Sequence, residues 1–202
     1  MSFISYAQNY EDVMLWRALR RVEHGFYIDV GAAWPDQDSV TKHFYRQGWH
    51  GINIEPNPTL FQQYSRERPD DINLQVAVSD EPGETEIYMV ADTGLSSLSH
   101  EVVKDHVRLG YAYHSERVQV LTLQEICKEY VKGRDVHFLK IDVEGWEERV
   151  LKSNDWGYCR PWIVVVEATK PMTEVESYSA SESILLKIGY RFVYADGLNR
   201  YY

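Results

Sequence analysis

The sequence predicts an α/β domain with a doubly wound, mostly parallel sheet, and two observations carry that prediction. Short apolar runs alternate with segments of helical pattern: Phe26–Val30, Trp49–Glu55 and Ile72–Val78 are separated by Val40–Gln47 and Thr59–Arg68. Such alternation is typical of a parallel sheet covered by helices. Acidic residues also stand at the ends of apolar runs, where a parallel sheet gathers its ligands.

Size and composition fit one soluble globular domain over residues 1–202. The chain is 44% hydrophobic and 13% aromatic, enough for one buried core. The formal net charge of −10 argues against a nucleic-acid or anionic-membrane surface, which Lys and Arg would favour. Cys127 and Cys159 lack CxxC spacing, so two reduced thiols are expected. Because the sequence shows no signal peptide or transmembrane-length apolar run, we expect a cytoplasmic protein.

The remaining elements follow from the same patterns. Residues 1–24 form a helical N-terminal segment, with a helix over Ser5–Arg21 that Gln8 or Asn9 would cap. The unbroken apolar run in Trp162–Val166 suits a strand buried on both faces. The other expected elements are strands 84–90, 118–121 and 136–143, helices 123–131, 147–152 and 179–188, and a closing antiparallel hairpin of 190–194 with 199–202.

Residues 91–117 interrupt this alternation. The segment is polar and carries His100, His106 and His114. A loop of this length inside a compact domain is typical of a functional lid, so we expect it to cover an acceptor site. Any of the three histidines is a candidate general base, but their spacing has no metal signature and we expect them to be solvated. His43, on the first sheet helix, is expected to be a surface or packed residue.

Five carboxylates are expected at one edge of the sheet. Each stands at or just beyond the carboxyl end of a predicted strand: Asp29, Glu55, Asp80, Asp142 and Glu167. Turns favour aspartate, so one acidic strand end is ordinary. Five in register predict a cleft lined by acidic groups, because the carboxyl ends of parallel strands share one edge.

The turn after the first strand favours a ligand without a pyrophosphate. Asp29 and Gly31 open this turn, but Ala32 and Ala33 stand where a dinucleotide fingerprint needs glycines. The departure disfavours NAD and FAD. Glu55, at the end of the next strand, is suited to accept hydrogen bonds from both hydroxyls of a ribose, and its alternative role is to cap the loop that follows.

A second informative stretch is Phe138–Gly145. In a strand, Lys140 and Asp142 share one face. Buried charges are costly unless they pair with each other or serve a site. Two interpretations stay open: a Lys140–Asp142 pair that satisfies itself, or a catalytic and acceptor site that includes Asp142 and Glu144.

Short motifs also occur in a fixed order along nearly the whole chain. They are 5–12 (SYAQNYED), 28–32 (IDVGA), 53–58 (NIEPNP), 77–80 (AVSD), 95–98 (LSSL), 121–123 (LTL), 139–147 (LKIDVEGWE) and 196–202 (DGLNRYY). Together they resemble the FkbM family of S-adenosylmethionine-dependent methyltransferases. The resemblance implies a class I methyltransferase (Rossmann-like) fold, a doubly wound seven-stranded sheet whose last strand is antiparallel. The loop with Trp34-Pro35 is similar to methyltransferase modules fused to bacterial surface-glycan glycosyltransferases.

The resemblance assigns roles to residues that match these motifs. The implied cofactor contacts are Asp29, Gly31 and Ala32 for the methionine moiety of S-adenosylmethionine, Glu55 for its ribose, Ser79 and Asp80 for its adenine side, and Gln8 with Ser97 of the 95–98 loop for closure. The implied catalytic residues are Asp142, Glu144 and Lys140, with Asp142 as the base and a lid histidine second. A divalent metal on Asp142, Glu144 and Glu167 is an alternative that we do not expect.

The expected function is S-adenosylmethionine-dependent O-methylation of a sugar hydroxyl on a bacterial glycan, such as a terminal deoxysugar. Two rivals stay open: an NAD(P)-dependent oxidoreductase and a catalytically silent module beside a glycosyltransferase. The chain stops within a predicted strand at Tyr201-Tyr202, which predicts a domain of a longer protein. A glycosyltransferase domain in that protein would be a partner and a route to the inner membrane face. No nucleic-acid partner is expected.

Overall fold

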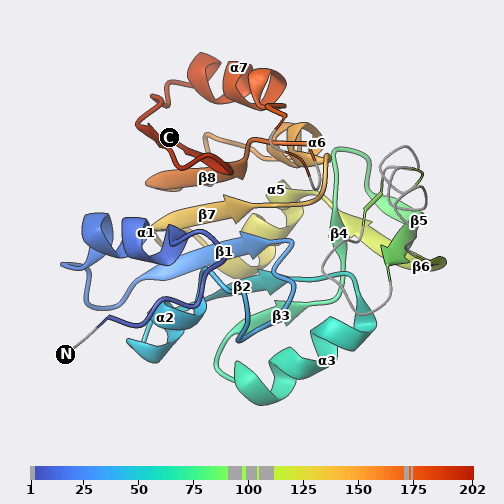
Figure 1. The fold of residues 1–202 in the computed structure, drawn as a ribbon, viewed down its shortest axis with the longest axis horizontal. Coiled ribbons are helices and arrows are strands. Elements are labelled where there is room, and N and C mark those ends of the chain that lie inside the picture. Colours follow the sequence, from blue (N-terminus) through green and yellow to red (C-terminus); the bar gives the residue numbers. More distant parts are fainter. Residues whose placement is uncertain (1–2, 91–96, 99–103, 105–111, 171–172, 174) are drawn as a thin grey trace.

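The computed structural model describes residues 3–90, 97–98, 104, 112–170, 173 and 175–202. Its centre is a seven-stranded sheet with the strand order β3-β2-β1-β7-β8-β10-β9 (Figure 1). The strands are β1 (Phe26–Val30), β2 (His50–Ile54), β3 (Ile72–Leu74), β7 (Phe138–Ile141), β8 (Ile163–Glu167), β9 (Tyr194–Ala195) and β10 (Asn199–Tyr201). The pairs among the first five are parallel, and β10 runs antiparallel to β8 and β9. This confirms the predicted fold.

Helices cover both faces of this sheet. They are α1 (Glu11–Leu19), α2 (Lys42–Arg46), α3 (Pro58–Glu67), α5 (Leu123–Ile126) continued by the π-helical turn η1 (Cys127–Val131), α6 (Glu147–Lys152) and α7 (Ser179–Lys187). Side chains of β1 alternate between two cores: Ile28 packs with residues of α5, α6 and α7, while Tyr27 packs with residues of α1 and α2. The odd-numbered face of β1 therefore also carries Asp29 into the layer beneath α1 and α2.

A second, three-stranded sheet corrects one sequence prediction. Its order is β4-β6-β5, formed by β4 (Ala77–Val78), β5 (Gly83–Val90) and β6 (Tyr113–Leu121). The single strand predicted over Ile72–Val78 is wrong, because β3 pairs with β2 whereas β4 pairs with β6. The chain changes sheets after Leu74, and Ala77 enters a third small core between β5 and β6. Hydrophobic pattern alone does not reveal such a change, since both halves are apolar.

The predicted lid over residues 91–117 is corrected at its carboxyl end. β6 begins at Tyr113 and pairs with β5, so residues 113–117 belong to a strand. His114 lies on that strand, exposed, with its Nε2 atom 3.3 Å from Glu116. Residues 91–96, 99–103 and 105–111, with His100 and His106, lie outside the described residues. His43 is packed, with its ring 3.8 Å from that of Phe3.

The N-terminal helix is shorter than predicted. α1 begins at Glu11, not at Ser5, and its N-cap is Tyr10, which has a φ of 63° and makes no capping hydrogen bond. Neither Gln8 nor Asn9 caps it. The Asp12 carboxylate instead accepts hydrogen bonds from Ser5 Oγ at 2.7 Å and from the backbone N–H of Tyr6 at 2.8 Å, which folds the preceding segment back over the helix start. Local acceptor chemistry outweighs helix propensity here.

The closing hairpin is also shorter than predicted, because β9 contains Tyr194–Ala195 alone rather than 190–194. Tyr190 is buried and donates its hydroxyl to the Pro161 carbonyl at 2.6 Å. This contact holds the chain outside the hairpin until β9 begins at Tyr194. Among the described residues, no helix has both the length and the apolarity needed to cross a membrane.

Candidate active site

A cavity of about 620 Å³ opens at the carboxyl ends of β1, β2, β7 and β8. It lies beside the point where the strand order reverses, between β1 and β7, which is where doubly wound sheets bind ligands. The region of β4 and β5 contributes apolar side chains only, and most of the acidic lining lies at the carboxyl ends of the central strands. The apolar residues include Val76, Ala77, Val78, Ile87 and Leu98, and the polar ones include Gln8, Asp38, Glu55, Asp142, Glu144, Glu167, Thr169 and Thr173.

The turn after β1 admits only glycine at residue 31. Gly31 has a φ of +76°, and a Cβ atom there would lie 1.7 Å from the carbonyl oxygen of Asp142. The N–H groups of Gly31 and Ala32 both donate to the Ile54 carbonyl, at 3.0 and 3.1 Å. These hydrogen bonds fix the turn within the fold, and Gly31 and Ala32 both line the cavity.

Lys140 joins the two aspartates of the predicted site. Its ammonium lies 3.7 Å from Asp29, 3.3 Å from Asp142 and 3.0 Å from the Gly31 carbonyl, to which it donates a hydrogen bond. Burial alone would lower the pKa of Lys140, but the carboxylates of Asp142 and Asp29 raise it, so the lysine is a cation. Asp142 lines the cavity. Asp29 is buried behind it, where burial raises its pKa, and supports the site from beneath.

Glu55 caps the neighbouring loops, the alternative role that the sequence left open. Its two oxygens accept backbone N–H groups of the loops on either side, Ala33 at 2.9 Å and Asn57 at 2.8 Å. The side chain also lines the cavity although it is 5% exposed. Burial raises the pKa of Glu55 to about 7. Each oxygen retains a second lone pair, so a hydroxyl-bearing ligand can bind a carboxylate that the fold has already positioned.

Ser79 and Asp80, predicted on the adenine side, do not line the cavity. They hold residues that follow β7. Ser79 Oγ accepts the indole N–H of Trp146 at 3.1 Å, and Asp80 accepts the guanidinium of Arg149 at 3.0 Å. That guanidinium lies 4.9 Å from the Trp146 ring centre. Trp146 does line the cavity, so the pair acts on the site through the indole.

The acidic side of the cavity keeps several oxygens without a hydrogen-bond donor. Within the described part of the chain, these are Glu144 Oε2, Glu167 Oε2 and Thr169 Oγ1. Burial raises the pKa values of Glu144 and Glu167, and the charge of Asp142 raises both further. The β7–β8 register continues from Ile141 opposite Val166, which brings Asp142 and Glu167 to neighbouring strand ends.

The two residues predicted to close over the cofactor differ in position. Gln8 lines the cavity, at the end of the segment that Asp12 folds back. Ser97 is buried outside the lining and donates its hydroxyl to the Glu144 carbonyl at 2.9 Å, while its neighbour Leu98 faces the cavity. Residues 95 and 96 of the predicted closing loop lie outside the described residues.

Comparison with known proteins identifies the family. A sequence model of the methyltransferase FkbM domain matches residues 29–192, most of the chain. The chain belongs to the FkbM methyltransferase family. The fold is similar to the crystal structure of methyltransferase FkbM from Methylobacillus flagellatus KT, with a TM-score of 0.54 and 13% identity over 97% of this chain and 48% of that one. This FkbM domain therefore spans about half the length of the Methylobacillus chain.

A TehB-like SAM-dependent methyltransferase from Corynebacterium glutamicum aligns with this FkbM domain at a TM-score of 0.49 and 9% identity, over 95% of this chain and 86% of that one. No curated protein matches the sequence. Membership in a methyltransferase family leaves the oxidoreductase alternative without support.

Among the residues with described positions, no group of three or more His, Cys, Asp or Glu side chains has an arrangement that could hold a metal ion. The lining residues that carried no site prediction include Trp34, Trp146 and Thr169. Both tryptophans stand inside or beside quoted motifs, which is a signal that could have found them. Thr169 lies two residues beyond the end of β8 and has no motif of its own.

Proposed function

We propose that this FkbM domain is an S-adenosylmethionine-dependent O-methyltransferase that methylates a sugar hydroxyl of a bacterial glycan. The observation that carries the proposal is a single cavity with a glycine turn and a buried glutamate at one end and an acidic cluster at the other. Family membership supports methyl transfer, and the donor set supports a ligand that offers hydroxyl groups and a positive charge.

The residues present fit the cofactor. Glu55 would accept the ribose hydroxyls, and the methionine moiety would lie against Gly31, which lines the cavity and has no side chain. Asp142 and Glu144 lie where a cationic sulfonium is favoured. The apolar lining beside Trp146 suits the adenine ring. When bound, S-adenosylmethionine supplies an electrophilic methyl group on sulfur.

Asp142 is the proposed base. It lines the cavity with 28% of its side chain exposed, which gives an acceptor access to its carboxylate. In an in-line displacement at that methyl group, Asp142 would accept the proton that the acceptor hydroxyl loses. Lys140 fixes the Asp142 carboxylate at 3.3 Å and is itself fixed by the Gly31 carbonyl. Positioning of the hydroxyl supplies much of the rate in such an in-line displacement.

Charge favours a neutral acceptor such as a sugar. The described lining carries five acidic side chains, and its one cation, Lys140, already pairs with Asp29 and Asp142. An acceptor phosphate or carboxylate near Asp142 would meet like charge. Neutral glycosyl hydroxyls can donate to the open oxygens of Glu167 and Thr169. We further propose that the full-length protein carries a glycosyltransferase domain and that it is located in the cytoplasm.

The experiment combines calorimetry with S-adenosylhomocysteine and labelled-methyl transfer from S-adenosylmethionine onto rhamnose-type and other deoxysugar glycans. We expect saturable 1:1 binding and label on at least one neutral glycan. A folded protein that does not bind S-adenosylhomocysteine would overturn the proposal. Binding without transfer to any hydroxyl acceptor would instead favour the catalytically silent module.

A further inference from the structure

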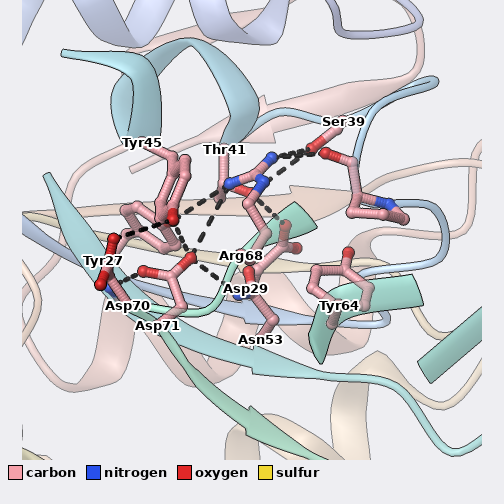
Figure 2. A network of polar contacts seen from close by, with 12 residues as sticks. Tyr27, Asp29, Ser39, Thr41, Tyr45, Asn53, Tyr64, Arg68, Asp70 and Asp71 are labelled. Carbon is pink, nitrogen blue, oxygen red and sulfur yellow. Dashed lines mark hydrogen bonds and ion pairs between the residues drawn. The ribbon is translucent and has the colours of Figure 1, made fainter. Parts of the chain in front are cut away.

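Arg68, which follows α3, is fully buried beneath the sheet, and Figure 2 shows its guanidinium surrounded by polar groups. It donates to the Pro35 carbonyl at 2.6 Å, to Ser39 Oγ at 3.1 Å and to the Tyr27 hydroxyl at 3.3 Å. Its ion-pair partner Asp71 lies farther away, at 3.8 Å. A buried arginine with a purely electrostatic role would contact the carboxylate most closely. This one is directed at the chain between residues 35 and 39.

Tyr64 reaches the same segment from one helical turn earlier. Its hydroxyl donates to the Ala32 carbonyl at 2.8 Å, and its side chain is fully buried. The backbone N–H of Arg68, the residue that caps α3, donates to the Tyr64 carbonyl at 2.8 Å. Because this bond holds the two residues together at the end of the helix, we describe Tyr64 and Arg68 as one clamp. Their acceptors, the carbonyls of Ala32 and Pro35, both belong to the segment 31–41, which we call the cofactor loop.

The cofactor loop has a conformation that needs support. Gly31, Ala33 and Asp38 have φ values of 76°, 48° and 51°. Left-handed backbone at a non-glycine residue persists where surrounding contacts determine it. Five residues of the loop line the cavity: Gly31, Ala32, Ala33, Trp34 and Asp38. The clamp therefore acts on the conformation that forms one wall of the site.

A chain of polar contacts continues from the clamp to the proposed base. Ser39 Oγ lies 3.5 Å from Thr41 Oγ1, which donates to Asp29 at 3.3 Å (Figure 2). Asp29 lies 3.7 Å from the Lys140 ammonium. Each link is buried. Loss of Arg68 would remove the first link and leave Ser39 free to rotate away from Thr41.

We propose that Arg68 and Tyr64 are positioning residues that hold the cofactor loop in its cavity-forming conformation and thereby set affinity for the cofactor. The effect on cofactor affinity rests on the proposed function, whereas the effect on the loop does not. Neither side chain lines the cavity, so both act through the backbone of the loop.

The experiment measures hydrogen exchange and S-adenosylhomocysteine binding on Arg68→Met and on a matched control, Arg200→Met. Arg200 is also largely buried and bonds Glu182 at 2.7 Å, but it lies on β10 away from the cavity. In the ligand-free protein we expect exchange at amides 31–33 and 39 to rise about 10- to 100-fold in Arg68→Met, as loss of charged hydrogen bonds predicts, with β8 and β10 unchanged. Arg200→Met should raise exchange in β10 alone.

For S-adenosylhomocysteine, we expect the dissociation constant to rise about tenfold or more in Arg68→Met and less than about twofold in Arg200→Met. Ser39→Ala removes only one acceptor of the guanidinium and keeps the proposal falsifiable if Arg68→Met does not fold; it should raise loop exchange about three- to tenfold. Normal loop exchange in either folded variant would overturn the loop role. Normal affinity despite faster loop exchange would overturn the link to the cofactor. Absence of binding by the wild-type protein would instead reject the proposed function, with the exchange result still deciding the loop role.

Discussion

Two glutamates at opposite ends of one cavity have similar burial and different surroundings. Glu55, after β2, is 5% exposed, and Glu167, at the end of β8, is 8% exposed. Both oxygens of Glu55 accept backbone N–H groups. Glu167 keeps Oε2 without a donor in the described part of the structure, as does Thr169 Oγ1 two residues later.

We call the Glu55 end of the cavity preformed, because its carboxylate is already hydrogen-bonded, and the Glu167 end open, because it keeps oxygens without a donor. A buried polar atom without a partner costs about 1–3 kcal/mol, so such atoms persist where a ligand supplies the missing hydrogen bond. The end at Glu55 is held before any ligand arrives, in keeping with a cofactor common to the whole family. The end at Glu167 and Thr169 leaves two acceptor oxygens open to a hydrogen-bond donor on a bound ligand.

The largest expected effect comes from Asp142→Asn. Because Asp142 lines the cavity between these two ends, we expect turnover to fall by about two to four orders of magnitude, as loss of a general base predicts. Affinity for S-adenosylhomocysteine should change less than about threefold, since the Glu55 end is intact. Initial rates of labelled-methyl transfer and calorimetry measure the two quantities.

Glu167→Gln on the neighbouring strand is the matched control. Burial raises the pKa of Glu167, so this side chain is a neutral acid at pH 7 and glutamine resembles it in charge and shape. Turnover should fall about tenfold at most, far less than in Asp142→Asn. If turnover fell as far in Glu167→Gln as in Asp142→Asn, Asp142 would not be the base by itself, and Asp142 and Glu167 would act together.

Much of the fold could be predicted from the sequence, because strand ends, glycine turns and helix patterns are local signals. The central sheet and the gathering of Asp29, Glu55, Asp142 and Glu167 at one edge follow from them. Asp80 also lies near that edge but contacts Arg149 instead of the cavity. The direction in which a side chain points depends on its tertiary partners, and the sequence pattern of a strand does not reveal them.

The conformation of the cofactor loop could not be predicted from the sequence. Ala32 and Ala33 stand where a dinucleotide motif needs glycines, and the sequence does not indicate how such a loop keeps its left-handed residues. The support comes from Tyr64 and Arg68, which are distant in sequence and resemble ordinary positions of a polar helix end. A buried arginine cannot be distinguished from a solvated one by pattern alone.

The second prediction tests the preformed end through pH. Burial raises the pKa of Glu55 to about 7, and hydroxyl donors favour its ionised form. Affinity for S-adenosylhomocysteine should therefore rise about tenfold from pH 6 to pH 8 and level off, with proton release below pH 7. Glu55→Gln should bind about 10- to 100-fold more weakly at pH 8 and lose this pH dependence. Calorimetry in buffers of different ionisation enthalpy measures both.

Stability of the ligand-free protein should follow pH in the opposite direction. A carboxyl group whose pKa is raised by folding stabilises the fold below its ordinary value of 4.5, and that contribution is lost as pH rises through 7. The melting temperature of wild type relative to Glu55→Gln should therefore fall over the interval in which affinity rises. Parallel changes in both quantities would contradict a buried Glu55 that ionises for its ligand.

The smallest expected effect belongs to Ser79→Ala, which tests whether Ser79 acts through Trp146. The variant removes the acceptor of the Trp146 indole N–H and no lining atom, because Ser79 is outside the cavity wall. A single neutral hydrogen bond contributes about 0.5–1.5 kcal/mol, so affinity for S-adenosylhomocysteine should fall about two- to tenfold.

The double variant that combines Trp146→Phe with Ser79→Ala should bind S-adenosylhomocysteine no more weakly than Trp146→Phe alone, since both changes break the same hydrogen bond. Thr122→Ala, which removes the capping hydroxyl of α5 away from the cavity, should lower the melting temperature without changing affinity. Additive losses in the double variant would mean that Ser79 contributes to affinity independently of Trp146, as a direct contact with the cofactor would, which is the role that the family resemblance implied.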